Sequence, residues 1–247
     1  MRQAKISPTG AAERPSLKEG DHLEAARITT FDMAMTGSVV LLVACHVAAA
    51  LVGLGWTTAV ATDMLAAVYL AALCVRPEWR AILARLFLVG IIAGVIELAT
   101  DAAGQYVAHS LVYPPDEPFL WASPIYMPLS WAIVSTQLGY LGWRLRNRIP
   151  PVRMALAVLV SFAAGAVLVP FYEEMAFLAG WWRYTSFPVI SHVPVYVILF
   201  EGLVSAAFPL LLNGLGRKSL ARTALAGLAI GAWMPVAAFL TWSVIGR

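Results

Sequence analysis

Apolar residues fill seven long windows of the chain, and polar or charged residues gather between them. About 20 mostly apolar residues are enough for a helix to span the hydrocarbon core of a bilayer. Only a few residues around Gly55 and Trp56 separate the first two windows, which predicts a tight helical hairpin. The pattern therefore predicts an all-α, polytopic membrane bundle of seven transmembrane helices, at 33–54, 57–75, 84–107, 125–143, 154–179, 193–213 and 222–244.

The first 30 residues differ from the rest, because they are polar and carry charges of both signs. No short apolar core with a small-residue cleavage site follows them, so we expect a disordered cytosolic tail rather than a signal peptide. Residues 31–247 are predicted to form a single transmembrane domain, and no repeat of fixed period is evident in the sequence.

Composition supports a membrane protein, since 60% of the residues are hydrophobic and only 13% are charged. Cys45 and Cys74 lie singly in apolar windows, which excludes a disulfide framework and a cysteine-rich zinc site. The net charge of +3 comes from short basic segments between the windows. Membrane topology explains these segments better than nucleic-acid binding does.

The basic residues alternate between the two sides of the predicted bundle. Fifteen of the 17 fall in the tail and in the loops after the second, fourth and sixth windows; only Arg183 and Arg247 lie on the other side. By the positive-inside rule the N-terminus is cytoplasmic, as in a multi-pass protein of the bacterial inner membrane. Tryptophan and tyrosine gather at the opposite ends of the windows, and the proline-rich loop 109–124 is expected to cap the outer mouth.

Acidic residues inside the predicted spans are the main candidates for chemistry, because carboxylates at membrane depth are costly and mark functional sites. Glu97 and Asp101 are four residues apart and therefore share a helix face. At about 1.5 Å of rise per residue, the carboxyls of Glu97, Glu173 and Glu201 reach a similar depth in the outer half of the membrane. The six acids inside spans are Asp63, Glu97, Asp101, Glu173, Glu174 and Glu201.

Two kinds of chemistry suit such a cluster. A neutral carboxylic acid beside an ionised one can transfer a proton. Several carboxylates can instead hold a divalent cation, but oxygen-only sites usually need more ligands. We favour proton chemistry, with Glu97, Asp101, Glu173 and Glu201 as the catalytic group and with no metal or cofactor. Glu173 and Glu174 point about 100° apart on a helix, and Glu173 is expected to face inward.

Aromatic and imidazole side chains near the outer ends are candidates to line the same cavity, although each can also serve in packing. They are Tyr106, Tyr126, Trp131, Trp181, Trp182, Tyr184 and His192. Aromatic faces attract cations, so these side chains suit a site in which a carbocation forms.

Two segments of the chain resemble the membrane carotenoid-biosynthesis proteins that hydrate terminal double bonds of carotenoids. In the first segment the residues that match are Glu97, Gly104, Tyr106, Pro124, Pro128, Leu129 and Trp131; in the second, EEMAFLAGWWRY followed by ISHVPVYVILFEG, they are Gly180, Trp182, Tyr184 and Pro194. The resemblance covers roughly residues 90–210. The chain departs from the family pattern where Glu173-Glu174 replaces an Asp-Pro pair and where Phe200-Glu201 replaces an Asn-Phe pair. Membrane lycopene cyclases and meroterpenoid cyclases are similar more loosely.

The resemblance implies a cofactor-independent enzyme that protonates a C=C bond of a lipophilic isoprenoid. Capture of the cation by water makes the enzyme a hydratase (a lyase), and capture by a second alkene makes it a cyclase (an isomerase). Membrane lipid and this substrate would be its partners, without nucleic acid. The alternatives are a proton- or cation-coupled transporter that uses the same acids, and a non-catalytic membrane scaffold. The scaffold would leave the buried glutamates without a role.

Overall fold

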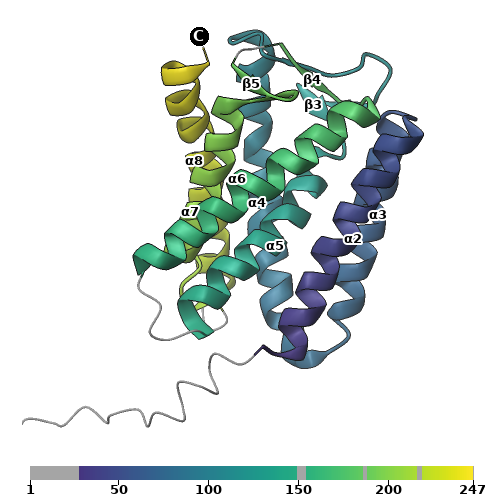
Figure 1. The fold of residues 1–247 in the computed structure, drawn as a ribbon. Coiled ribbons are helices and arrows are strands. Elements are labelled where there is room, and N and C mark those ends of the chain that lie inside the picture. Colours follow the sequence, from purple (N-terminus) through teal and green to yellow (C-terminus); the bar gives the residue numbers. More distant parts are fainter. Residues whose placement is uncertain (1–27, 149–153, 186–187, 216–218, 247) are drawn as a thin grey trace, which may run out of the picture.

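The structure, a computed structural model, describes residues 28–148, 154–185, 188–215 and 219–246. Within these ranges the chain forms seven helices, which confirms the predicted helix in every apolar window (Figure 1). Most of the predicted cytosolic tail lies outside the described residues. The helices are α2 (Thr30–Val52), α3 (Trp56–Leu73), α4 (Pro77–Tyr106), α5 (Met127–Arg148), α6 (Met154–Ala179), α7 (Val195–Leu211) and α8 (Leu220–Ile245).

Five of these helices, α2, α3, α4, α6 and α8, are long and apolar enough to cross a membrane. Helix α7 is apolar but has only 17 residues, and α5 carries several polar and basic side chains near its end. Many of the large apolar side chains on the outside of the bundle are exposed, such as Leu51, Val167 and Val244. These long apolar helices are compatible with a multi-pass membrane protein.

The turn between α2 and α3 is as tight as the sequence predicts. Gly53 and Gly55 both have a φ of 65°, a backbone conformation that suits glycine. The backbone N–H of Gly55 donates to the carbonyl of Ala179 at the end of α6. This bond attaches the α2–α3 hairpin to the rest of the bundle.

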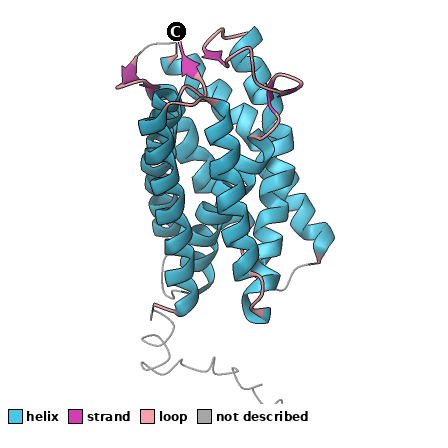
Figure 2. Cartoon of the chain, turned by 90° about the vertical axis from the view of Figure 1, so that its right-hand side faces the viewer, coloured by secondary structure: helices cyan, strands magenta, loops and turns pink. Residues whose placement is uncertain are grey.

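Six two-residue strands lie together at one end of the bundle, the strand end (Figure 2). Strands β1 (Leu111–Val112) and β4 (Arg183–Tyr184) pair antiparallel and join two loops that are far apart in the sequence. The other four form two short hairpins, β2 (Phe119–Leu120) with β3 (Ser123–Pro124), and β5 (Val189–Ile190) with β6 (Val193–Pro194).

The two hairpins have the same local geometry. Each turn contains one non-glycine residue with positive φ, Trp121 at 58° and Ser191 at 55°. Each is closed by an equivalent backbone bond of 2.9 Å, from Ile125 N to Pro118 O and from Val195 N to Pro188 O. Each leads directly into a helix, α5 or α7. The chain therefore contains two copies of one unit: α4–β1–β2–β3–α5 and α6–β4–β5–β6–α7.

An approximate twofold axis relates these two repeats. The antiparallel pairing of β1 with β4 joins equivalent strands across that axis. Where α5 meets α7, Gly142 lies against Pro209 and Gly139 lies against Leu212. Gly139 is equivalent to Pro209 and Gly142 to Leu212, so the axis converts each of these contacts into the other. The sequence shows no repeat of fixed period, so this duplication is a finding of the structure. The two copies share backbone geometry and a few residues, such as Pro124 and Pro194, but no long stretch of similar sequence.

Away from the strands the helices pack closely through small residues. A Cβ at Gly165 would lie 2.0 Å from Ser205 Oγ, and one at Gly90 would lie 2.7 Å from the Cα of Ala132. Small residues at such contacts let helix backbones approach each other, as they do in membrane bundles. Leu86, Phe208 and Leu212 fill the space between helices and are almost completely buried.

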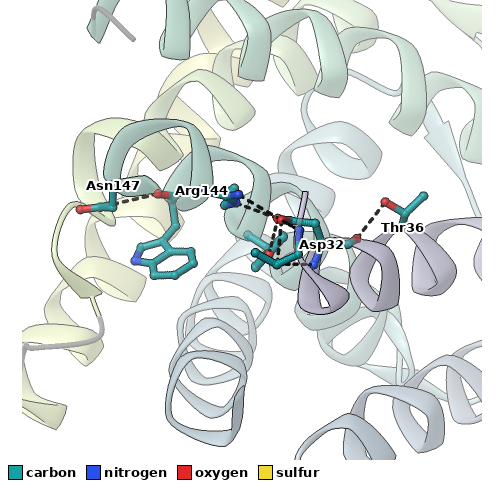
Figure 3. A network of polar contacts seen from close by, with 7 residues as sticks. Asp32, Thr36, Arg144 and Asn147 are labelled. Atoms are coloured by element: carbon teal, nitrogen blue, oxygen red, sulfur yellow. Dashed lines mark hydrogen bonds and ion pairs between the residues drawn. The ribbon is translucent and has the colours of Figure 1, made fainter. Parts of the chain in front are cut away.

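A polar network ties α2 to α5 at the end opposite the strands (Figure 3). Asp32 accepts hydrogen bonds from Arg144 Nε at 2.8 Å, from Arg144 Nη2 at 3.1 Å and from the Tyr140 hydroxyl at 2.7 Å. Thr29 and Asp32 also form a reciprocal capping box at the start of α2. The network thus stabilises both the start of α2 and its packing against α5.

Candidate functional site: an acid-lined cavity

A mostly apolar cavity of about 230 Å³ lies in the half of the bundle nearest the strands. All seven helices contribute to its lining, and the loop after α4 adds Ser110, Leu111 and Tyr113. The expectation that the loop 109–124 covers one end of the bundle therefore holds for its first part. The cavity lies between the two repeats, where α4 and α6 end and where α5 and α7 begin.

Four carboxyl groups from three helices face this cavity, as the sequence predicts: Glu97 and Asp101 from α4, Glu173 from α6 and Glu201 from α7. Glu97, Asp101 and Glu201 are 3%, 7% and 2% exposed. The four are close enough for each to act electrostatically on others of the group. No arginine or lysine lines the cavity among the described residues, so their charges are not neutralised by a basic side chain.

Glu97 and Asp101 are both buried and both face the cavity from α4. Asp101 accepts a hydrogen bond of 2.6 Å from the Tyr113 hydroxyl. Glu97 Oε2, in contrast, has no hydrogen-bond partner among the described residues. Since a donated hydrogen bond favours the charged form of a carboxyl group, Asp101 is better stabilised as an anion than Glu97.

Glu173 is held by two donors from the segment that follows its own helix. Trp182 Nε1 donates at 2.7 Å and the Tyr184 hydroxyl donates at 2.9 Å, both to Oε2. Burial raises the pKa of the Tyr184 and Tyr113 phenols well above their usual range, so both keep their protons and act as donors. Asp101 and Glu173 are thus the carboxyls best stabilised as anions.

Glu174 faces away from the cavity, which confirms that Glu173 is the inward member of the pair. Its carboxylate accepts from the Ser191 hydroxyl at 2.9 Å and from the His192 backbone N–H at 3.0 Å, and it lies 2.7 Å from His192 Nδ1. These bonds hold the turn of the β5–β6 hairpin against α6. Glu174 therefore has a structural role at the strand end.

Glu201 differs from the other three acids, because among the described residues no donor or acceptor is hydrogen-bonded to its carboxyl. It lies on α7 beside Phe200, and its backbone carbonyl oxygen is close to Gly165 of α6. A carboxyl that faces an apolar cavity without a partner is free to interact with a bound molecule.

Asp63 also lines the cavity, from α3, where its side chain is 6% exposed. The Ser130 hydroxyl of α5 donates to its Oδ2. Asp63 is therefore a fifth buried acid at the edge of the cluster.

Four of the predicted aromatic residues line the cavity: Trp131, Trp181, Trp182 and Tyr184. The other three predictions do not hold. Tyr106 is 62% exposed on the outer face of α4, His192 contacts Glu174 and stacks on Phe177 at 3.8 Å, and Tyr126 donates to Glu117 at 3.0 Å under the β2–β3 hairpin. All three residues lie at the strand end, but their side chains do not line the cavity.

Several lining residues were not predicted from the sequence to face the cavity. His46 and Tyr172 stack at 4.5 Å on one wall, and Phe200, Tyr196, Phe239 and Trp242 complete the aromatic surface. They occupy ordinary apolar windows, so only the three-dimensional packing distinguishes them from residues that face lipid.

The donor set does not favour a metal ion. In the part of the chain that the structure describes, no group of three or more histidine, cysteine, aspartate or glutamate side chains has a metal-binding arrangement. Two of the carboxyls are already engaged by tyrosine and tryptophan donors, which would compete with a cation. The site is better suited to holding and moving protons.

The fold and the cavity define an all-α protein with five helices that could span a membrane and an acid-lined internal site. Residues 98–245 match the family profile described as a domain of unknown function, DUF6989, and the chain belongs to that family. The matched segment runs from the second half of α4 to the end of α8 and contains both hairpins and three of the four carboxyls. The searches of curated proteins and of solved structures gave no match.

Proposed function

We propose that this protein is a membrane enzyme that protonates a C=C bond of a lipophilic, isoprenoid-like substrate and gives a hydrated or cyclised product. The convergence of Glu97, Asp101, Glu173 and Glu201 on one apolar cavity carries the proposal. The resemblance of residues 90–210 to carotenoid hydratases, and more loosely to membrane terpene cyclases, supports the substrate class. The proposal needs neither a metal nor a cofactor.

In this proposal all seven helices span the membrane and the N-terminus is cytoplasmic. The positions of the basic side chains support this orientation. Arg76, Arg85, Arg144 and Arg222 belong to helix ends opposite the strands, whereas Arg183 lies within strand β4. The strand end then faces outward and the cavity lies in the outer half of the bilayer.

The proton donor is one of the two acids that lack a stabilising donor of their own, Glu97 or Glu201. Its O–H bond breaks while the π electrons of the alkene form a new C–H bond, and the carboxylate keeps the O–H electrons. The neighbouring tertiary carbon becomes a cation. The apolar walls exclude water during this step, which strengthens the interaction of the acids with developing charge.

The cation lies among aromatic side chains that can stabilise it through their ring faces, with Trp131 and Phe200 in an edge-to-face pair at 6.4 Å. Water then adds through its oxygen, or a second alkene adds through its π electrons. The proton released by water or by the ring carbon passes to Asp101 or Glu173, which are the carboxyls held as acceptors. Internal proton exchange then restores the starting state.

The size of the cavity indicates how much of the substrate it holds. Pockets that enclose a whole drug-sized ligand measure about 300–1,000 Å³, and this one measures about 230 Å³. It therefore suits one end of a long hydrocarbon, with the remainder outside the cavity. Reaction at a terminal double bond fits this arrangement.

The test is to replace Glu97 or Glu201 by glutamine and to compare the isoprenoid lipids of expressing cells and of reconstituted vesicles. We expect both variants to abolish the product while the protein remains in the membrane. Glu174→Gln is the matched control, because Glu174 adjoins Glu173 in sequence but faces away from the cavity. Full product formation by both cavity variants would exclude the mechanism.

One observation favours a second candidate, a proton-coupled transporter. Parallel repeats related by an axis along the membrane normal occur in several transporter families, with the substrate site between the repeats. The cavity of this protein also lies between two repeats. Proton-driven uptake of a solute into vesicles, lost in Glu201→Gln, would favour this candidate over the enzyme.

A further inference from the structure

The lining of the cavity is mostly hidden inside the bundle, but three lining residues are largely exposed on its outside. They are Ala103 and Val107 at the strand end of α4 and Phe239 on α8. Val107 is 73% exposed and Phe239 is 64% exposed. Since every other lining residue is buried or only partly exposed, these three mark the place where the cavity reaches the outer surface of the bundle.

The packing of α8 explains why an opening lies between these two helices. In its first half α8 is pressed against α4, where a Cβ at Gly227 or at Gly231 would lie 2.9 Å or less from Ile92 or Ile96. Pro235 then removes one backbone hydrogen bond from α8. Beyond it, Trp242 and Ile245 pack on the cluster formed by Val193, Tyr196 and Val197 at the start of α7. The outer half of α8 therefore rests on α7, and space remains between α8 and α4.

The rim of the opening is apolar. Ala103, Val107 and Phe239 carry no hydrogen-bonding side chains, and Pro235 and Ala238 continue the apolar surface inward. Exposed apolar side chains at this level of a membrane bundle contact lipid chains rather than water. A hydrocarbon can pass such a rim without losing hydration, whereas a polar solute would have to be desolvated.

We propose that the gap between the strand end of α4 and the outer half of α8 is a lateral portal, through which the hydrocarbon chain of the substrate enters the cavity from the bilayer. The portal leads to Glu97 and Asp101 on α4 and to Glu201 on α7. The inference rests on the proposed lipophilic substrate for its purpose. A lateral portal also explains how a small cavity can bind one end of a long hydrocarbon, because the part of the substrate that does not fit remains in the lipid.

The test uses the full chain in phosphatidylcholine vesicles with a long-chain hydrocarbon that carries a terminal diazirine. Light converts the diazirine to a carbene that inserts into neighbouring bonds, and mass spectrometry locates the adducts. We expect adducts on the cavity segments around Glu97–Asp101 and Glu201. The double variant Val107→Trp, Phe239→Trp should narrow the portal and reduce these adducts several-fold. Ala103→Trp, on the same rim, is a second variant in case the double variant does not fold.

The matched control is Val95→Trp with Val236→Trp, on the same two helices. Both valines are exposed, at 52% and 48%, but neither lines the cavity. Cavity adducts should persist in this control. Unchanged cavity adducts in the folded rim variants, or adducts confined to lipid-facing residues in the unmodified protein, would overturn the portal. Labelling does not depend on turnover, so a protein whose cavity is labelled but which forms no product would keep the portal and refute the enzyme.

Discussion

Asp101 and Glu173 occupy equivalent positions in the two repeats of this protein. Each lies ten residues before the first residue of the strand that follows its helix, Leu111 in β1 and Arg183 in β4. Each accepts a hydrogen bond from a tyrosine in or beside that strand, at 2.6 Å from Tyr113 and at 2.9 Å from Tyr184. The duplicated unit therefore supplies the cavity with two similar carboxyl–phenol pairs.

Removing either phenol should weaken the function of its carboxyl. A hydrogen bond to a charged group contributes about 1.5–3 kcal/mol, which corresponds to roughly a ten- to hundredfold change in rate. We expect Tyr113→Phe and Tyr184→Phe each to lower turnover by about that factor, and the pH dependence of turnover to shift as well. Tyr106→Phe is the control, since Tyr106 is exposed outside the cavity. A rate and a pH profile that are unchanged in both variants would contradict this role.

Glu117 should make the stability of the strand end depend on pH. Burial raises its pKa to about 7, to which the nearby charge of Asp116 contributes, while the bond from Tyr126 acts in the opposite direction. The folded protein therefore binds a proton that the unfolded chain, with an ordinary glutamate pKa, releases at lower pH. The contribution of protonated Glu117 to the stability of the fold is fully present below the ordinary glutamate pKa. It is lost as the pH rises through about 7.

Glu117→Gln removes that dependence, because glutamine stays neutral at every pH. Melting curves in detergent at pH 5 and pH 8 would measure the effect. We expect the melting temperature to change less between pH 5 and pH 8 in Glu117→Gln than in the unmodified protein. Relative to the unmodified protein, the variant should be more favoured at pH 8 than at pH 5. A variant that loses stability equally at both pH values would show that Glu117 does not titrate in this way.

The ion pair between Asp32 and Arg144 should contribute strongly to stability. Their side chains are 18% and 10% exposed, so the pair is partly buried, and the cost of breaking it is bounded by the value of about 3–5 kcal/mol for a fully buried pair. We expect Asp32→Asn to lower the melting temperature clearly while leaving turnover per folded molecule unchanged. Glu78→Gln is the control, because the pair of Glu78 with Arg76 is 3.9 Å long and mostly exposed. Comparable losses in the two variants would contradict the assignment.

The contact between α6 and α7 should tolerate no larger residue at Gly165. An alanine there would place its Cβ 2.0 Å from Ser205 Oγ and 2.6 Å from the carbonyl oxygen of Glu201. We expect Gly165→Ala to destabilise the protein by about 1–3 kcal/mol or more through overpacking, as measured by thermal unfolding. Gly104→Ala should be tolerated, since its Cβ would be 3.4 Å from the nearest atom. Equal stability of the two variants would show that α7 moves without penalty.

Hydropathy predicted the helices well, because each must present a long apolar surface. The window 154–179 coincides with α6 at both ends. Helix α4 begins seven residues earlier than predicted, at Pro77, since its first turn contains Glu78 and Arg80, which lower the local hydropathy. Proline at the first helical position favours a helix start that an average over a window does not detect.

The acids of the site could also be predicted, because a carboxyl inside an apolar window has few explanations. Helical geometry indicated that Glu173 and Glu174 cannot both face the cavity, and the structure places Glu173 there. The loops could not be predicted in the same way. The strands have two residues each, too few for a periodic pattern. The directions in which the Tyr126 and His192 side chains point therefore depend on turns that only the structure defines.

The same loops hid the repeat. Its two hairpins share Pro118 with Pro188 and Pro124 with Pro194, but Trp121 and Ser191 perform the same turn with unlike side chains. The two hairpins share backbone geometry but few identical side chains, so a search for identical residues does not reveal the relationship.

Seven residues after the last proline of each hairpin, one copy has Trp131 and the other has Glu201. Two identical repeats would present the same side chains to both ends of a bound molecule, which would then have no preferred orientation in the cavity. At this position the two repeats therefore present different chemistry to the cavity, an indole ring from α5 and a carboxyl group from α7. The lining is not symmetric, so a bound molecule can distinguish its two sides and take one orientation.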